Sequence, residues 1–298
     1  METTLALRGI YVPLITPFTE SGELAADALE SLAHRILDGG AAGLAALGTT
    51  GEPGALDEAE RAAVLEICSR VCRERGAELI VGAGGSATRQ TVEALRALKG
   101  QPGVTAALTL VPPFLRPSDA GVLAHFRELA AHSPVPLVIY HIPYRTGQLL
   151  TTATLRELAT LPGVAGIKLA TGAVDPQAVE LVGAGLPGFA VLGGDDAVLP
   201  PLLALGAAGG ILASAHLVTA RWVELVAAWR AGEVERARAL GHRLAGLAAA
   251  AFAEPNPTVI KGVLHAQGLI PSPAVRLPLL PAAPEAVARA AALAAELD

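Results

Sequence analysis

The sequence predicts an α/β fold, a (β/α)8 barrel followed by a C-terminal helical extension. Two features of its 298 residues lead to this prediction. Eight short apolar runs are each followed by a helical stretch, with roughly 20–35 residues in each unit. The runs are uninterrupted rather than alternating with polar residues, which is typical of parallel strands that are buried on both faces.

The expected strands are 10–15, 44–48, 79–83, 106–111, 136–140, 164–168, 189–192 and 209–213. The segments between them are amphipathic or rich in alanine, which has the highest helix propensity. The expected helices are 25–38, 57–74, 88–98, 119–132, 151–160, 175–183 and 195–204. A doubly wound open sheet is the alternative. It is disfavoured because ITPFTESG follows the first strand, where a dinucleotide-binding sheet carries G-x-G-x-x-G.

The pattern changes after the eighth run. Beyond residue 220 the sequence shows only helical patterns, over 221–253, 258–269 and 284–297. We therefore expect a barrel over 1–225 that carries the active site, and a helical extension over 226–298 that packs on it. No repeat or low-complexity linker separates the two parts.

Composition argues against several classes of protein. Apolar residues make up 52% of the chain and charged residues 17%, which excludes intrinsic disorder. A net charge of −6 and only 3% aromatic residues argue against a nucleic-acid partner. Residues 198–218 are uncharged, but prolines and glycines interrupt them, so we expect no membrane span. The first residues lack the pattern of a signal peptide, and we expect a cytoplasmic protein.

The active site of such a barrel lies at the carboxyl ends of its strands. The chemically capable side chains at these ends are Thr49, Thr50, Glu52, Tyr140, Arg145, Lys168, Asp195, Asp196, Ser214 and His216. We interpret the two aspartates as caps of the following helix. The seven histidines show no metal-ligand spacing such as H-E-x-x-H, so we expect neither a metal ion nor another cofactor.

Lysine usage singles out one of these positions. Only three of the 22 basic residues are lysine. Lys99 precedes a glycine at a helix end, where a cation complements the helix dipole, and Lys261 is expected to be a surface charge near the barrel mouth. Lys168 ends a strand among apolar neighbours, where burial would lower its pKa and give a nucleophilic neutral amine. A salt-bridged lysine at a strand end is the alternative.

Three other kinds of side chain at the strand ends have two interpretations each. The phenol of Tyr140 is suited to proton transfer or is a packed aromatic. The hydroxyls of Thr49 and Thr50 bind a carboxylate or cap the next helix. The guanidinium of Arg145 binds a carboxylate with two hydrogen bonds or is a surface charge.

Four motifs at the strand ends occur together. They are GTTGE (48–52), YHIPYRTG (140–147), GIKLATG (166–172) and GGDD (193–196). VPLITPFTESG, GAGGSAT and EPNPTVIKGVL support them, at 12–22, 82–88 and 254–264. Over residues 8–280 the chain thus resembles the dihydrodipicolinate synthase / N-acetylneuraminate lyase family of class I pyruvate-dependent aldolases.

The resemblance implies a TIM barrel whose lysine forms a Schiff base. Lys168 matches the residue that forms an imine with pyruvate or another 2-oxo acid. Tyr140 matches the tyrosine that transfers protons at the imine. Thr49 and Thr50 match the hydroxyl pair that binds the 2-oxo acid carboxylate and joins the proton relay.

The resemblance also implies residues that bind the substrates. Arg145 matches the arginine that holds the carboxylate of the aldehyde in the synthases. Ile211 matches a position on the eighth strand whose backbone faces the substrate. We place Gly194, in the GGDD motif, among the substrate-binding positions as well.

The chain departs from the synthase pattern at several positions. Phe114 stands in VPPFLRP, where synthases carry a relay tyrosine that reaches the neighbouring subunit's site. Because phenylalanine has no hydroxyl, the relay to solvent is interrupted there. His141 stands where asparagine is common, and Leu169 stands where glutamate is usual. The residues that form the imine thus match the family, whereas the identity of the aldehyde substrate stays open.

The resemblance leaves three functions open, and the first is favoured because Arg145 is retained. The first is a lyase similar to 4-hydroxy-tetrahydrodipicolinate synthase, which joins pyruvate to aspartate semialdehyde. The second is an aldolase or dehydratase of 2-keto-3-deoxy sugar acids, and the third is a catalytically idle protein that binds small carboxylates. The resemblance also implies a homotetramer built as a dimer of dimers, with Phe114 packed across the tight interface.

Overall fold

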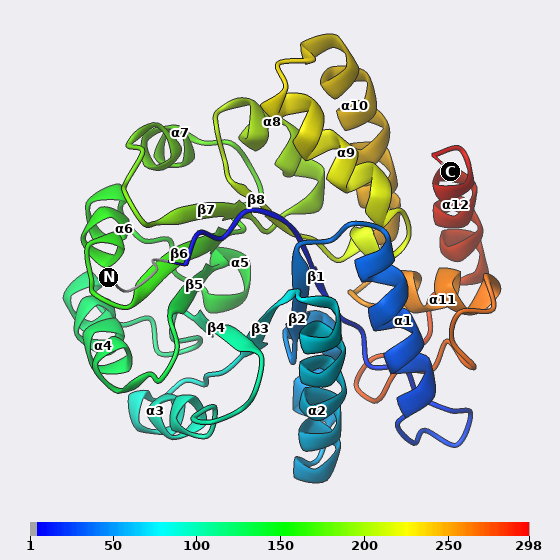
Figure 1. The fold of residues 1–298 in the computed structure, drawn as a ribbon, viewed down its shortest axis with the longest axis horizontal. Helices are drawn as coiled ribbons and strands as arrows, with labels where there is room; N and C mark the ends of the chain where they lie inside the picture. The colour runs from blue at the N-terminus through cyan, green and yellow to red at the C-terminus, as the bar shows by residue number, and fades with distance from the viewer. Residues whose placement is uncertain (1–4, 298) are drawn as a thin grey trace.

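The computed structural model describes residues 5–297 and confirms the expected barrel. Eight parallel strands close in the order β1 to β8, with β8 paired to β1 (Figure 1). Their bounds are β1 (Gly9–Pro13), β2 (Gly43–Ala46), β3 (Glu78–Gly82), β4 (Val104–Leu110), β5 (Leu137–His141), β6 (Val164–Leu169), β7 (Ala190–Gly193) and β8 (Gly209–Ile211). All bounds lie within two residues of those expected from the sequence.

Helices surround the strands. They are α1 (Ala26–Asp38), α2 (Glu58–Arg75), α3 (Thr88–Arg96), α4 (Asp119–His132), α5 (Pro143–Thr146), α6 (Thr152–Ala159), α7 (Pro176–Gly183), α8 (Leu199–Ala204) and α9 (Thr219–Arg230). Local chemistry sets their ends. A capping box joins Asp57 and Glu60 at the start of α2, and Gly76 ends that helix in the left-handed conformation. Within residues 5–297 no helix is both long and apolar enough to cross a membrane.

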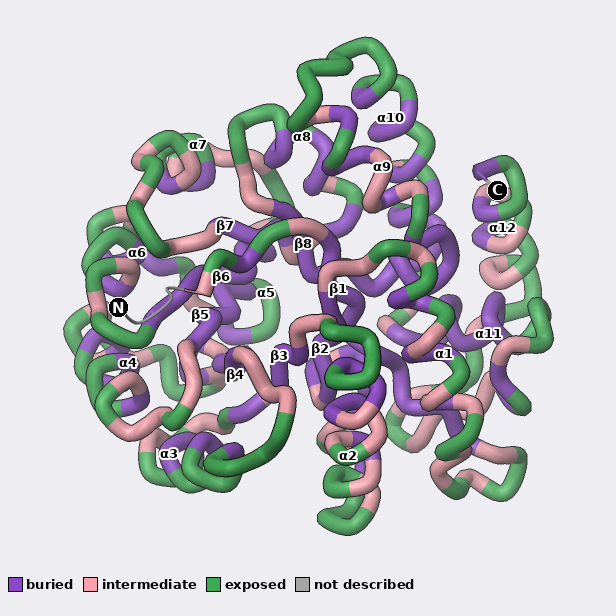
Figure 2. The backbone as a smooth tube through the Cα atoms, in the orientation of Figure 1, coloured by how far each residue is buried: buried purple, intermediate pink, exposed green. Residues whose placement is uncertain are grey.

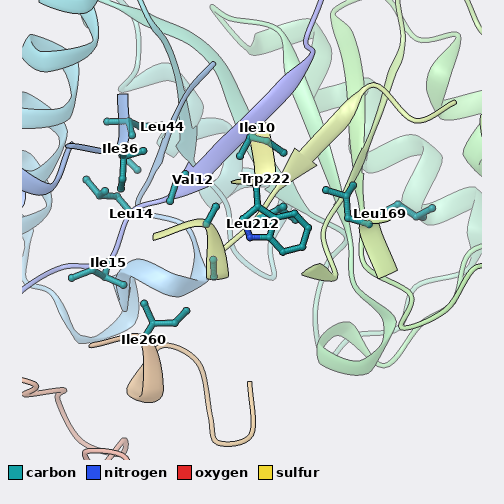
Figure 3. Close-up of a cluster of buried hydrophobic side chains, with 14 of the residues drawn as sticks. Ile10, Val12, Leu14, Ile15, Ile36, Leu44, Leu169, Leu212, Trp222 and Ile260 are labelled. Carbon is teal, nitrogen blue, oxygen red and sulfur yellow. The ribbon is translucent and has the colours of Figure 1, made fainter. Parts of the chain in front are cut away.

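Alternation along each strand builds two apolar layers. One set of side chains fills the barrel, including Tyr11, Ile80, Val138 and Tyr140. The other set packs against the helices. Figure 3 shows part of this second layer, where residues of β1 lie beside Trp222 of α9. In Figure 2 the strands are largely buried, and the exposed residues lie on the outer helices and loops.

The C-terminal extension contains α10 (Val234–Ala251), α11 (Thr258–Ala266) and α12 (Pro284–Ala295). Helix α10 packs on α8, α9 and α12, and α11 packs on α12. Figure 1 shows α11 and α12, in orange and red, outside the ring of barrel helices. The expected boundary at residue 225 falls inside α9, which contacts β1 as the eighth helix of the ring.

Candidate active site

The carboxyl ends of β5 and β6 bring Tyr140 and Lys168 together. The two residues are directly paired in the parallel register. Both side chains point into the barrel, and each residue is 6% exposed. The Lys168 Nζ lies 4.3 Å from the centre of the Tyr140 ring. The sequence placed these residues on neighbouring strands, and the structure shows that they are in contact.

Burial changes the protonation of the Lys168 amine. It lowers the pKa to about 8, because the charged ammonium is desolvated. The carboxylates of Asp196 and Asp195 oppose this effect, and Arg145 adds to it. An amine with a pKa of 8 is about 10% neutral at pH 7, against about 0.03% for an ordinary lysine. A larger share of the Lys168 amine is therefore neutral near pH 7 than for an exposed lysine.

Tyr140 remains a protonated phenol at neutral pH. Burial raises its pKa above the ordinary value, while Arg145 and a hydrogen bond with the Thr49 hydroxyl act in the opposite direction. The phenol and this hydroxyl form a short path along which a proton can move. The ring that carries this phenol lies beside the Lys168 amine.

The two threonines lie in a 3-10 turn after β2. The turn spans Thr49–Gly51, and the capping residue of α2 is Asp57, so the threonines do not cap that helix. Thr16 Oγ1 donates a hydrogen bond of 2.7 Å to the Gly51 carbonyl and holds the turn against the β1 loop. Thr50 is buried, and its hydroxyl oxygen accepts a hydrogen bond from the C-terminal extension, described below.

A cavity of about 1400 Å³ opens beside these groups. Thr49, Tyr140 and Arg145 line it. The Arg145 guanidinium lies in α5, 4.9 Å from the Tyr144 ring centre, and is exposed, so it can meet an anionic substrate as it enters. The cavity also extends outward between α2 and α3. A hydroxyl, a phenol and a guanidinium, those of Thr49, Tyr140 and Arg145, thus share the wall of one open cavity.

Gly194 lies close to the lysine, and neither Gly194 nor Ile211 lines the cavity. A Cβ at Gly194 would come within 2.8 Å of the Lys168 Cγ and Cε, so a side chain there would displace the lysine. Ile211 ends β8, pairs with Tyr11, and belongs to the apolar layer inside the barrel. The structure therefore indicates that Gly194 gives the lysine side chain its space.

The expected helix-capping role of Asp195 and Asp196 is wrong. A 3-10 turn over Asp196–Val198 precedes α8, so the α-helix begins later than expected. Asp195 Oδ2 accepts from the Gly172 N–H (2.5 Å), and Asp196 Oδ2 accepts from the Ser214 N–H (2.6 Å). The carboxylates bridge neighbouring loops instead. Burial raises the pKa of Asp196 to about 6.

The expected surface position of Lys261 is also wrong. Lys261 is 0% exposed, and its Nζ lies 2.5 Å from Glu52 Oε1 and 2.9 Å from the Ala274 carbonyl. It also lies 4.1 Å from the centre of the Phe18 ring. The sequence did not predict this buried ion pair or a role for Asn256. Lys261 and Asn256 both lie in the EPNPTVIKGVL motif, and the scarcity of lysine was a further signal for Lys261.

Phe114 is not among the described residues that line the cavity. It follows β4, is 84% exposed, and has a positive φ of 69°. Its neighbour Leu115 and Tyr144 of α5 are exposed apolar side chains as well. Among residues 5–297, no three His, Cys, Asp or Glu side chains are grouped to hold a metal ion.

The chain is similar to known proteins over nearly its whole length. A model described as the dihydrodipicolinate synthetase family matches residues 6–296. The chain is 36% identical over 275 residues to a 4-hydroxy-tetrahydrodipicolinate synthase of Protochlamydia amoebophila (92% of this chain, 91% of the relative). It is 37% identical over 279 residues to that of Synechococcus elongatus (93% and 91%).

Solved structures agree with the sequence comparison. Dihydrodipicolinate synthase DapA-2 of Bacillus anthracis superimposes with a TM-score of 0.92 and 28% identity, covering 99% of each chain. The dihydrodipicolinate synthase of Acinetobacter baumannii, complexed with pyruvate, superimposes with a TM-score of 0.91 and 33% identity (97% of this chain, 99% of that chain).

Proposed function

Because the chain belongs to the dihydrodipicolinate synthetase family, whose members are Schiff-base-forming lyases of class I aldolase type, we propose that it condenses pyruvate with aspartate semialdehyde on Lys168. The observation that carries the proposal is the buried lysine with a lowered pKa, in contact with the Tyr140 ring at paired strand ends. The catalytically idle alternative is set aside, since the relatives are named as synthases.

Lys168 performs the first step. Its neutral amine attacks the carbonyl carbon of the 2-oxo acid, and loss of one water molecule leaves an imine. Protonation of the imine nitrogen makes it an electron sink, so the neighbouring carbon loses a proton and an enamine forms. The enamine carbon then attacks the aldehyde carbonyl carbon, and the carbonyl oxygen takes up a proton to become a hydroxyl. Water, or the amino group of the semialdehyde part, then adds to the imine carbon and releases the lysine amine.

Tyr140 and Thr49 move the protons of these steps. The phenol stays protonated at neutral pH, so it can give a proton to the departing hydroxyl and take one back. Thr49 shares a hydrogen bond with it and extends the path into the cavity. Both groups are neutral, which suits a site where a cationic imine forms.

Two groups bind the carboxylates of the substrates. The Thr50 hydroxyl, with the backbone of its turn, binds the 2-oxo acid carboxylate. Arg145 binds the carboxylate of the aldehyde at the cavity wall. Ile211 contributes backbone beneath the substrate, and Gly194 leaves room for the lysine and the bound carbon chain.

A comparison of substrates tests the proposal. Purified protein is assayed with pyruvate plus aspartate semialdehyde, and separately with 2-keto-3-deoxygluconate. Because Phe114 lacks the relay hydroxyl, the sugar acid reaction is the second candidate. A higher kcat/KM with aspartate semialdehyde would support the synthase activity. Turnover of the sugar acid alone would instead show an aldolase or dehydratase of sugar acids.

The cytoplasmic location expected from the sequence remains a prediction.

Phe114→Tyr is expected to raise the rate of condensation at least about tenfold, because a positioned proton-transfer group contributes 10²–10⁴-fold. Phe114→Leu is the matched control, since it changes the side chain without supplying a hydroxyl. The measurement is kcat with pyruvate and aspartate semialdehyde. A wild-type enzyme that is already fast and unaffected by the tyrosine would refute the interrupted relay.

We also propose a homotetramer made of two tight dimers. The exposed apolar side chains of Phe114, Leu115 and Tyr144 support a contact between subunits at this loop. Multi-angle light scattering is expected to give about four times the 30.2 kDa mass of the chain. A monomer at micromolar concentration would contradict the assembly.

A further inference from the structure

We propose that Asn256, which the C-terminal extension supplies, is a positioning residue that orients the Thr50 hydroxyl toward the carboxylate of the 2-oxo acid. The inference rests on the proposed function, in which Thr50 binds that carboxylate. It extends the active site beyond the barrel to a residue between α10 and α11.

The geometry joins two distant parts of the chain. Asn256 Nδ2 donates a hydrogen bond of 2.9 Å to Thr50 Oγ1, across 206 positions of sequence. Asn256 also lines the cavity that Thr49 and Tyr140 line. Its Oδ1 is buried and has no hydrogen-bond partner among residues 5–297. Thr50 is therefore the side chain on which this amide acts.

The direction of this hydrogen bond decides what the hydroxyl can do. A threonine hydroxyl has one proton to donate and lone pairs with which to accept. When its oxygen accepts from the amide of Asn256, the proton stays available for another acceptor. A hydroxyl that accepts one hydrogen bond also becomes a better donor of the next. The carboxylate of a 2-oxo acid is the acceptor that this arrangement favours.

A second set of contacts, centred on Glu52, holds the turn that carries Thr50 against the C-terminal extension. Glu52 follows the turn in the left-handed conformation (φ 52°), which is strained for a residue with a side chain. Its carboxylate accepts from Lys261 Nζ (2.5 Å) and from the Arg276 N–H (3.1 Å). The Arg276 guanidinium also pairs with Glu60 and donates to the Gly22 and Ala55 carbonyls. Because these contacts do not involve Asn256, its substitution should leave the turn in place.

The test measures the pyruvate concentration that gives half-maximal borohydride trapping of the imine. Asn256→Ala removes the donor, and we expect this concentration to rise about threefold to tenfold. Asn256→Asp keeps the size of the side chain but can only accept, so it competes for the Thr50 hydroxyl proton and adds a negative charge. We expect a rise of about tenfold to a hundredfold at pH 8. This larger effect should shrink at pH values where the new carboxyl is protonated.

A double-mutant cycle separates positioning from general support of the fold. In a Thr50→Val background the hydroxyl is absent, and Asn256→Ala should cause no further change. Thermal unfolding of each variant is measured alongside, and the Asn256 variants should unfold close to the wild-type midpoint. If Asn256 only supported the fold, Asn256→Ala would lower the midpoint of thermal unfolding. It would also raise the half-maximal pyruvate concentration equally in the wild-type and Thr50→Val backgrounds.

The outcomes distinguish this inference from the proposed function. Failure to trap pyruvate on the wild-type protein would overturn the proposed function, and this inference with it. Normal wild-type trapping, combined with equal effects of Asn256→Ala in both backgrounds, would overturn this inference alone. The same holds if Asn256→Asp binds pyruvate as tightly as the wild type.

Discussion

Lys168→Ala is expected to abolish imine formation and to reduce turnover at least about 10³-fold, because no other group at the strand ends can form the covalent intermediate. Borohydride reduction with pyruvate should tag the wild-type protein once per subunit, and peptide mapping should place the tag on Lys168. The fold should survive, since the substitution removes a buried amine that is costly to charge and leaves only a modest cavity.

Lys99→Ala is the matched control for this experiment. Lys99 is an exposed lysine at the C-terminal end of the α3 region, so its substitution should leave tagging and turnover unchanged. A tag that persists in Lys168→Ala, or that maps to Lys99 or Lys261, would overturn the assignment of the nucleophile.

The rate of imine formation should also follow the lowered pKa of the Lys168 amine. The nucleophile is the neutral amine. Its fraction rises about tenfold per pH unit below the pKa and levels off above it. With a pKa of about 8, the rate constant for imine formation should rise between pH 6 and 8 and flatten above that. A rise that continues past pH 10 would indicate an ordinary exposed lysine.

Much of the barrel could be predicted because its determinants are local. Each strand is an apolar run that is buried on both faces, and each helix is an amphipathic or alanine-rich segment next to it. Lys168 is predictable for a similar reason, since its strand end and its apolar neighbours are visible within GIKLATG. Tyr140 follows from the neighbouring strand. The parallel register then places the two residues opposite each other.

What escapes prediction depends on contacts between distant segments. Lys261 looks like a surface charge on a helix, and its burial follows only from its pairing with Glu52, 209 positions away. The role of Asn256 depends equally on Thr50. Asp196 has the sequence position of a cap because it precedes a helix, whereas its carboxylate binds the Ser214 N–H of another loop. Local patterns cannot reveal such partners.

Lys261→Met is expected to lower the free energy of unfolding by about 3–5 kcal/mol, the largest stability effect that we expect for a single substitution. Methionine fills similar space, so the loss comes from the Glu52 carboxylate, which would remain buried without its cation. The Glu52 side chain is only 3% exposed and cannot turn to water without moving the turn that carries Thr49 and Thr50. Urea unfolding at fixed protein concentration measures the change.

The double variant Lys261→Met with Glu52→Gln tests this explanation. It removes both charges, while the glutamine amide oxygen can still accept from the Arg276 N–H, so most of the lost stability should return. Lys99→Met, on the exposed lysine, should change stability by less than about 0.5 kcal/mol. If the double variant were as unstable as Lys261→Met alone, packing around Phe18, rather than an unpaired carboxylate, would account for the loss.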